Sequence, residues 1–576
     1  MDLLKYFSEP VSKRQKQYEA VRAFFVDKLS AEAIAFKFGY KTSTIYTIIR
    51  DVKAGKLDLF PEVAKGHKQR LTPETHQQEI LELRKQNYSI HDIYEKLLEI
   101  NIQVSVKTIE RIIKDNGYEK LPRRSNIERG VTNKNKIIPE MSENIDIALL
   151  KPFNLDCPAA GIYFFLPYII DSGIIDIVRK CKLPQSKIIG SVQACLSILL
   201  LKLIGNERLS QMEGYDHEPG LGVFAGLNVL PKSTYMGTYS CLTSEEMINK
   251  LQKEIITKFV QESPELYSGD FINFDFHSIP HYGDKSEMEK VWCGSKNKAI
   301  KGANTVFAQD SESNLIMYAR ADILRKDESK EVIKFVNYWK QIKGSVKETL
   351  VFDCKFTKYS VLNELDQDGI CFITLRKRND TLLSQTLEIP KEKWKKYKLD
   401  IPKRKHQKIS VYEETVKLKD CEKEFRQIII KDHGRLNPTY MITNNNKLPL
   451  IDVLKVYAKR WHIENKLAEL IAFFNLNALS SPLMIRIHFD ILWTLIADTL
   501  YHRFARDLKR FENNLAPTIF KKFINMPGRL VYDGECLTVK IRKRAHTPIL
   551  KGVEKLNKPF VIPWLNNIKM KIEWTT

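Results

Sequence analysis

The sequence predicts a multidomain α+β protein. At 576 residues the chain is longer than a protein with a single hydrophobic core usually is, so about three or four domains are expected. Apolar residues recur with the period of a helix through most of residues 14–268, and from residue 271 they follow the period of strands. Helical periodicity then returns after residue 450, which is the pattern of a mixed sheet covered by helices.

The charge balance is strongly basic and limits the function classes. Lys and Arg number 92 against 70 Asp and Glu, a formal net charge of +22. Such an excess favours a polyanionic partner, nucleic acid first and an anionic membrane second. We expect no membrane span and no secretory signal, because no run of 18 apolar residues occurs and MDLLKYFSEP is not apolar. The nine cysteines form no CxxC pair, which favours reduced thiols in a cytoplasmic protein over a zinc module or a disulfide framework.

Residues 14–54 are expected to form three short helices, with Ser30 as a cap and Gly39 in the turn before the third helix. This layout is that of a helix-turn-helix unit, which we expect within residues 1–60. The third helix would present its first residues to base edges, namely Lys41, Ser43, Thr44, Tyr46 and Thr47. A three-helix bundle without a DNA role is the alternative.

A second copy of the layout follows within residues 66–118. Ser89 and Ser105 are candidate N-caps, and Gly117 is a candidate C-cap. Its third helix would offer Ser105, Lys107, Thr108 and Arg111. Two such units in tandem indicate one long, bipartite DNA site.

A basic linker and a helical region come next. Residues 120–139 hold six basic residues and one acidic residue, without a hydrophobic period. Arg123 and Arg124 would lie on phosphates or in a minor groove, unless the linker is merely solvated. Residues 149–268 are mostly helical by period and form a helical subdomain in this interpretation.

From residue 271 the expected order is strand, strand, strand, helix, strand, helix, strand. The elements are 271–277, 304–310, 314–322, 327–343, 349–353, 360–369 and 370–376. Asp275 would lie on the first, central strand and Asp353 on the fourth, beside it. This adjacency would bring the two carboxylates together.

A third carboxylate is expected on a helix over residues 456–475. Tyr457, Arg460 and Glu464 are spaced i, i+3 and i+7 and share one helix face. A surface helix with an ordinary i, i+4 salt bridge is the alternative. Two strand-borne aspartates followed by a helix-borne glutamate form the order needed to hold two divalent metals for phosphodiester chemistry.

These residues resemble those of DDE transposases of the bacterial insertion-sequence type, which carry an RNase H-like catalytic core. Tyr457, Arg460 and Glu464 match the Tyr-x2-Arg-x3-Glu part of a family motif whose final Lys is replaced here by Ile471. The resemblance covers roughly residues 270–510. It implies that Asp275, Asp353 and Glu464 are catalytic and hold two Mg²⁺ ions, with Mn²⁺ as a substitute, and that Tyr457 and Arg460 contact DNA.

A basic segment, residues 376–447, separates the second aspartate from the glutamate. It holds 19 Lys or Arg against 10 Asp or Glu, and its alternating runs predict a β-rich insertion. Its position matches the β insertion of related transposases, which implies that Trp394 could stack a flipped base; a packing role in a small core is the alternative. The end of the chain predicts a hairpin with a basic strand, either an added sheet element or a DNA contact.

The sequence thus predicts a DNA transposase with double-stranded DNA, both element ends and target, as its partner, acting as a homodimer on DNA in the bacterial nucleoid. A catalytically inactive DNA-binding regulator is the alternative, and a structure-selective nuclease is a third hypothesis. The expected domains are 1–60, 66–118, 119–148, 149–268, 269–375, 376–447, 448–512 and 513–576.

Overall fold

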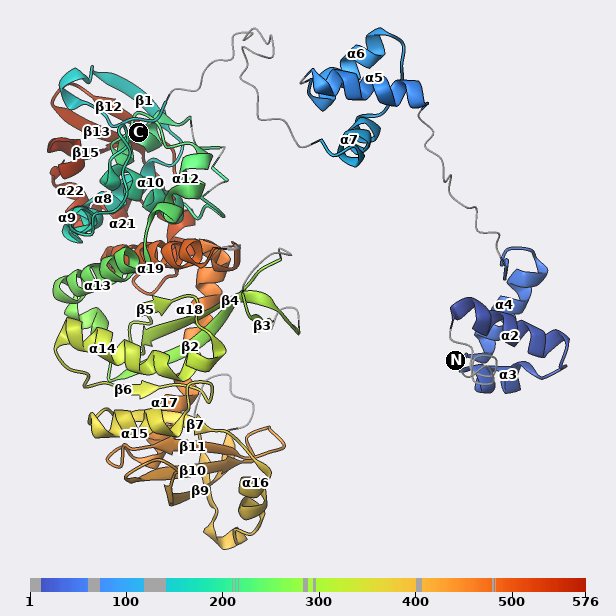
Figure 1. Ribbon diagram of the computed structural model, residues 1–576. Helices are drawn as coiled ribbons and strands as arrows, with labels where there is room; N and C mark the ends of the chain where they lie inside the picture. The colour runs from blue at the N-terminus through green and yellow to red at the C-terminus, as the bar shows by residue number, and fades with distance from the viewer. Residues whose placement is uncertain are drawn as a thin grey trace. The chain divides into compact units, whose positions relative to one another are not determined.

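The computed structural model describes residues 12–60, 73–118 and 141–576, except 87, 210, 213, 216, 283–287, 294–296, 400–406, 479, 480 and 482. The chain divides into two compact units, Met1–Lys136 and Ile137–Thr576 (Figure 1). Arg123 and Arg124, predicted to contact DNA, lie outside the described residues.

The first described segment is a cluster of three helices, as predicted. They are α2 Lys13–Phe25, α3 Ala31–Phe38 and α4 Thr42–Lys53. The Ser30 side chain caps α3 by accepting from the Ala33 amide, and Gly39 ends α3 with φ +61°. Ile34, Ile45 and Ile49 lie in the small shared core. Gly39 therefore sets the turn that places α4 against α3.

The second described segment repeats this arrangement with α5 Glu74–Lys85, α6 Ile90–Glu99 and α7 Val106–Asp115. Ser89 and Asp92 form a reciprocal capping box at the start of α6, and Ser105 caps α7. Gly117, at φ +78°, lies one residue beyond the C-cap of α7. The predicted helices and caps are confirmed, whereas their role in DNA binding stays a prediction.

The second unit begins with the predicted helical region, which the structure joins to the end of the chain. Its elements are β1 Phe153–Cys157, η2 Ala160–Phe165, α8 Leu166–Asp171, α9 Ile174–Lys180, α10 Ser191–Leu203, α11 Pro219–Ala225, α12 Ser233–Tyr239 and α13 Glu245–Glu262. The last strands are β12 Gly528–Tyr532, β13 Cys536–Arg542, β14 Phe560–Ile562 and β15 Ile568–Thr575. They form one sheet of order β1-β12-β13-β15-β14. The predicted C-terminal hairpin, β12–β13, is thus an added sheet element.

The core sheet follows the predicted order of strands and helices. Its first part comprises β2 Phe271–Pro280, β3 Lys290–Cys293, β4 Lys298–Asp310, β5 Ile316–Arg320, α14 Glu331–Lys343, β6 Thr349–Val351, α15 Tyr359–Gln367 and β7 Phe372–Arg376. β2 lies antiparallel to β4 and parallel to β6, and β6 lies parallel to β7. The short strand β3 was not predicted.

The β-rich insertion is confirmed, and it continues the core sheet. It contains α16 Asp380–Leu387, β8 Lys395–Lys398, β9 Lys408–Lys417, β10 Glu424–Lys431 and β11 Thr439–Thr443. β11 pairs antiparallel with β7, so the strand order runs β3-β4-β2-β6-β7-β11-β10-β9-β8, with β5 beside β4. The insertion is therefore hydrogen-bonded to β7, which pairs with β6 beside the candidate site.

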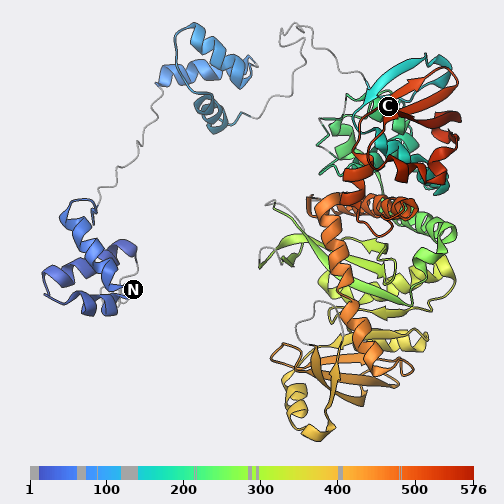
Figure 2. The ribbon, with the colours of Figure 1, turned by 180° about the vertical axis from the view of Figure 1, so that it is seen from behind.

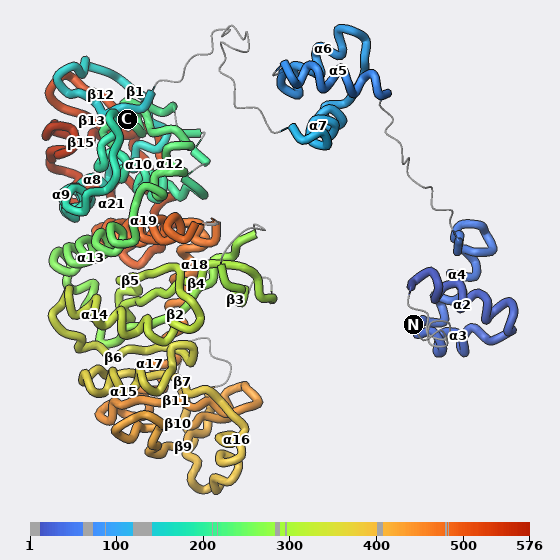
Figure 3. Tube along the Cα trace, in the orientation of Figure 1, coloured from blue at the N-terminus to red at the C-terminus, as the bar shows by residue number. Residues whose placement is uncertain are grey.

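Three helices follow the insertion: α17 Leu450–Lys459, α18 His462–Phe474 and α19 Met484–Asp507. Seen from behind, α17 and α18 run in succession across the sheet (Figure 2). The trace of α19 crosses between the core sheet and the part of the unit that contains β1 (Figure 3). Most side chains of α19 are buried, and its Asp490 pairs with the buried Lys202 at 2.8 Å. Among the described residues no single helix is long and apolar enough to cross a membrane, although the bent pair Ala160–Asp171 and Ile174–Lys180 together meet those criteria.

Close backbone packing at Gly161 gives a first testable prediction. A Cβ atom there would lie 2.4 Å from the carbonyl oxygen of Ile524 and 2.7 Å from that of Phe523. Gly161→Ala should therefore lower the free energy of unfolding by about 1–3 kcal/mol, the usual cost of overpacking. Thermal unfolding of the full chain measures this, with Gly214→Ala as the control, because a Cβ at Gly214 meets nothing within 4 Å. Equal transitions for the two variants would contradict the prediction.

Candidate active site

The first two carboxylates are brought together by strand register. β2 and β6 are parallel neighbours with Asn273 paired to Val351. Extending this register by two residues would set Asp275 level with Asp353 and on the same side of the sheet. The prediction that Asp353 lies on the fourth strand is wrong. Asp353 lies two residues beyond the end of β6. Its Oδ1 accepts from the Lys355 amide at 2.8 Å, which holds it in the turn.

The helix predicted over residues 456–475 is two helices. α17 ends at Lys459 and α18 begins at His462. At the junction, the amides of Arg460 and Glu464 donate to carbonyls three residues earlier, on Tyr457 and Trp461, at 3.2 and 3.0 Å. These tighter turns interrupt the α-helical ladder. Glu464 consequently lies in the first turn of α18, and Arg460 lies in the bend.

Arg460 lies between two of the carboxylates. Its Nη1 is 3.5 Å from Oδ2 of Asp275, and its Nη2 is 3.5 Å from Oε1 of Glu464. The guanidinium also lies 5.8 Å from the centroid of the Tyr457 ring. The guanidinium thus offsets the repulsion between the carboxylates through two contacts of 3.5 Å. Its buried Nε–H is left without an acceptor among the described residues.

The electrostatics show that the three carboxylates share one site. Burial raises the pKa of Asp275 to about 6; Arg460 opposes this rise, whereas Asp353 and Glu464 add to it by repulsion. Burial is the main cause of this rise, and the neighbouring carboxylates add to it. Glu464 is the most exposed of the three, with a side chain 59% exposed against 17% for Asp275. Its side chain is thus the one freest to change position.

The chemistry of these donors fits a divalent cation of the Mg²⁺ type, which prefers carboxylate oxygens. In the described part of the chain, however, no three His, Cys, Asp or Glu side chains are grouped closely enough to hold a metal ion. Arg460 lies where Asp275 and Glu464 would otherwise converge. Metal binding would require Glu464 to exchange its contact with Arg460 for a metal.

The nearby histidines favour packing over metal binding. Nε2 of His277 is 2.6 Å from Oδ1 of Asn477, and burial lowers the pKa of this imidazole. His277 therefore joins β2 to the turn after α18. His281 is buried, whereas His462 stacks edge-on against Trp461 at 4.7 Å between ring centroids.

Residues 268–500 match the model of a family described as the transposase DDE domain. This range contains Asp275, Asp353 and Glu464. The core of this chain, residues 268–500, is therefore similar to a transposase DDE domain.

Solved structures of transposases resemble the chain only distantly. The piggyBac transposase synaptic complex with hairpin DNA has 11% identity and a TM-score of 0.32, over 65% of this chain and 83% of that one. A pre-cleavage Mos1 transpososome has 10% identity and a TM-score of 0.13, over 62% and 77%. The Mos1 mariner paired-end complex with Mn has 10% identity and a TM-score of 0.12, over 60% and 71%. No curated protein matches the chain.

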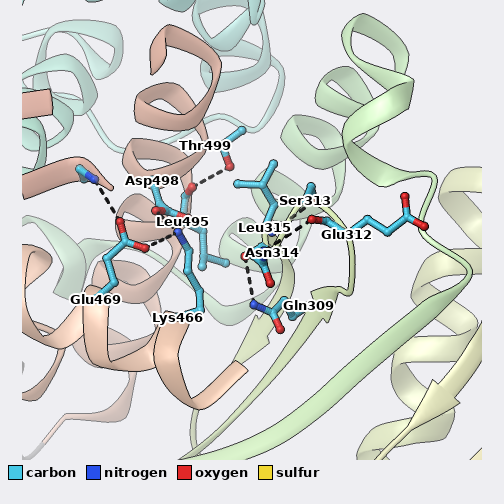
Figure 4. Close-up of polar contacts among 11 residues, drawn as sticks. Gln309, Glu312, Ser313, Asn314, Leu315, Lys466, Glu469, Leu495, Asp498 and Thr499 are labelled. Carbon is cyan, nitrogen blue, oxygen red and sulfur yellow. Dashed lines mark hydrogen bonds and ion pairs between the residues drawn. The ribbon is translucent and has the colours of Figure 1, made fainter. Parts of the chain in front are cut away.

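Lys466 lies on the face of α18 away from this site. Its Nζ donates to Oε2 of Glu469 at 2.9 Å and to Oδ1 of Asp498 on α19 at 2.7 Å (Figure 4). Glu469 also accepts from the Ala516 amide at 3.1 Å. All three charged side chains are buried. This cluster, which sequence reasoning missed, fixes α18 from behind while Glu464 faces the aspartates.

The other predicted site residues are described within their own domains. Trp394 packs with Leu382 and Tyr440 in a small core of the insertion, and Nζ of Lys431 lies 3.6 Å from the centroid of the indole ring. This position agrees with the packing alternative, and base stacking stays a prediction. In the three-helix clusters the exposed candidates are Lys41, Ser43, Lys107 and Arg111, while Thr44 and Thr108 are half-buried.

The buried cluster gives a second prediction. Lys466→Met would leave Glu469 and Asp498 buried without a cation, so the free energy of unfolding should fall by about 3–5 kcal/mol. Lys459→Met, which removes an exposed lysine, is the control and should change the free energy of unfolding by less than about 0.5 kcal/mol.

The effect of Lys466→Met should depend on pH. Burial already raises the pKa of Asp498 to about 6, with Lys466 opposing the rise. A carboxyl whose pKa is higher in the folded state binds more protons there, so its burial costs least at low pH and more as pH rises through the folded pKa. Removing Lys466 raises that pKa further. Denaturation at pH 5 and pH 8 should therefore show a smaller loss at pH 5, and an equal loss would refute this account.

Proposed function

We propose that the chain is a DNA transposase that binds the terminal repeats of its mobile element, cleaves DNA strands and joins the 3′ ends to target DNA. The observation that carries this proposal is the strand register that sets Asp275 level with Asp353, with Glu464 linked to Asp275 through Arg460. The match of residues 268–500 to the transposase DDE domain supports it.

Each residue has a role that follows from its position. Asp275, central and most buried, would hold both metal positions, and Asp353 and Glu464 would each hold one side. Two Mg²⁺ ions, or Mn²⁺ in their place, would relieve charge on the phosphate and activate the attacking water or 3′-hydroxyl. If Glu464 exchanged its contact with Arg460 for a metal, Arg460 would be free to donate to the scissile phosphate, which its planar fork suits. Tyr457 supports the guanidinium from the last turn of α17.

Recognition of the element ends is assigned to the two three-helix clusters. In a helix-turn-helix the start of the third helix meets base edges. The starts of α4 and α7 carry the exposed Lys41, Ser43 and Lys107, with Thr44 and Thr108 beside them, and the exposed Arg111 lies one turn further along α7. The basic linker with Arg123 and Arg124, which follows the second cluster, would track the DNA backbone, and Trp394 with its insertion would lie along the DNA end. Pairing two ends calls for a homodimer on the DNA, within the bacterial nucleoid.

Loss of the third carboxylate tests the catalytic assignment. Glu464→Ala should reduce nicking of a labelled duplex that carries the element's own end, measured in Mg²⁺, by more than about 100-fold. This loss would exceed the usual effect of removing a group that only supports a metal ligand. End binding by the variant should be unchanged. Asp275→Ala and Asp353→Ala should behave alike.

Glu364→Ala, which changes an exposed glutamate on α15, serves as the matched control and should cut like wild type. Retained cleavage by Glu464→Ala would refute the assignment. If wild type binds the end but cuts no candidate end, the chain is a DNA-binding regulator.

Salt dependence tests the recognition helices. Lys41→Ala and Arg111→Ala should weaken end binding, and each should flatten the slope of log K against log salt by about 0.9 if the side chain meets a phosphate. Fluorescence anisotropy at four salt concentrations measures the slope. Lys85→Ala, at the exposed end of α5, should leave it unchanged. A slope equal to that of wild type in both test variants would remove α4 and α7 from the interface.

A further inference from the structure

The hairpin formed by β3 and the start of β4 extends the strand pair that carries Asp275. β2 pairs with β4 up to Pro280 and Gly302, and β3 then pairs with β4 over residues 298–301. In Figure 1 this hairpin projects from the sheet beside α18. It was absent from the sequence prediction and has no part in the proposed chemistry.

Strand register places three side chains of this hairpin on the face that bears Asp275. Asp275 is paired with Phe307 on β4, so the odd-numbered residues of β4 point to the face of Asp275. Lys301 and Ala299 share that parity, and their partners on β3 are Lys290 and Trp292. Lys290, Trp292 and Lys301 therefore continue the active-site face outward; we call them the hairpin face.

Burial agrees with this assignment. Along β3 the side chains alternate, with Lys290 and Trp292 exposed and Val291 and Cys293 buried. Trp292 is 59% exposed, which is unusual for so large an apolar side chain. The two described stretches of the hairpin, 288–293 and 297–302, carry three lysines and one glutamate. By register two of these lysines, Lys290 and Lys301, lie on the hairpin face with the flat ring of Trp292, which is the composition of a nucleic-acid contact.

The base of the hairpin is held firmly. The Glu289 carboxylate accepts from the Arg325 amide at 2.9 Å, and the Arg325 guanidinium donates to the Lys290 carbonyl. Gly302 lets the strands approach closely, since a Cβ there would lie 2.6 Å from the carbonyl oxygen of Ile279. The only acidic side chain in these stretches is therefore engaged at the base, and the face above it keeps a fixed direction.

The distance along β4 from the hairpin face to Asp275 can be expressed as a number of base pairs of DNA. Ala299, the partner of Trp292, is eight residues from Phe307, the partner of Asp275. At about 3.3 Å per residue this is about 26 Å along β4. A duplex rises about 3.4 Å per base pair, so the hairpin face lies about eight base pairs from a phosphate at Asp275.

We propose that Lys290, Trp292 and Lys301 contact duplex DNA about eight base pairs from the scissile phosphate and so position it over the carboxylates. The partner is DNA because the face is basic, carries an exposed ring and points the same way as Asp275. This inference rests on the proposed function and adds to it a second DNA contact within the DDE domain.

The test compares the two faces of one hairpin in the full-length chain. Lys298 pairs with Cys293, so the same register places it on the opposite face. The probe is a labelled 40-base-pair duplex with the element's end at its centre, and anisotropy is read in Ca²⁺ at several salt concentrations. Lys290→Gln and Lys301→Gln should each flatten the salt slope by about 0.9, and Lys298→Gln should not change it. Trp292→Ala should weaken binding at least about fivefold, with Trp292→Phe recovering part of the loss.

Truncated duplexes locate the contact. When the duplex keeps fewer than about six base pairs on the side that reaches the hairpin, the hairpin-face variants should bind as wild type does. Equal losses for Lys290→Gln and Lys298→Gln, or losses that persist on every truncated duplex, would overturn the proposal. A change in oligomer mass by light scattering for Trp292→Ala, with DNA affinity intact, would assign the ring to a second copy and also overturn it.

Cleavage in Mg²⁺, measured on the same proteins, separates the two proposals. If wild type cuts the element end but the hairpin-face variants bind as wild type does, this inference fails and the proposed function stands. If wild type never cuts, yet the hairpin-face variants lose affinity on long duplexes only, the DNA contact stands and the catalytic assignment fails.

Discussion

The parallel pairing of β2 with β6 is the constraint on which the candidate site depends. A parallel ladder fixes which residues of the two strands are level, and a slip by one residue would turn one carboxylate to the other side of the sheet. The pairing of Asn273 with Val351 leaves Asp275 and Asp353 at matching positions beyond it. The strand pair therefore forces two like charges together, and the fold must offset their repulsion. Arg460 does so from the bend between α17 and α18.

The position of Glu464 depends on a second set of charges behind it. α18 is only 13 residues long, and an isolated helix of that length is marginal in water. Its orientation is fixed where Lys466 joins Glu469 and Asp498 in the buried interface with α19. A buried ion pair contributes little net stability but penalises misplacement strongly, because a displaced member leaves a buried charge unpaired. The exposed glutamate can thus move its side chain while its helix stays in place.

Much of this arrangement could be predicted from the sequence. The order of core strands and helices followed from hydrophobic period, and Ser30, Ser89 and Ser105 are N-caps as their residue type indicates. Such signals are local, so neighbouring residues suffice to interpret them. The spacing of Arg460 and Glu464 also indicated their contact, since i and i+4 remain adjacent across the tightened turn.

Features that depend on distant segments could not be predicted in this way. The pairing of β1 with β12 joins residues more than 350 positions apart, and no local pattern specifies such a partner. The buried role of Lys466 could not be predicted, because its partner Asp498 approaches it from another helix. The break at Arg460 was missed since the residues 456–475 keep a continuous helical period. A lysine within an apolar helix face was nonetheless a usable signal, because a buried lysine needs a carboxylate partner.

The continuity of the core sheet links these features into one surface. The strand order places the β3–β4 hairpin at one end, β2 and β6 with their carboxylates in the middle, and the basic insertion from β11 to β8 at the other end. Because β11 is hydrogen-bonded to β7, the insertion cannot swing independently of Asp353. A duplex lying over the carboxylates would meet basic groups on both sides, held by one hydrogen-bonded framework. Such a framework limits the orientations in which a phosphate reaches Asp275, and positioning is the part of phosphodiester chemistry that a protein scaffold must supply itself.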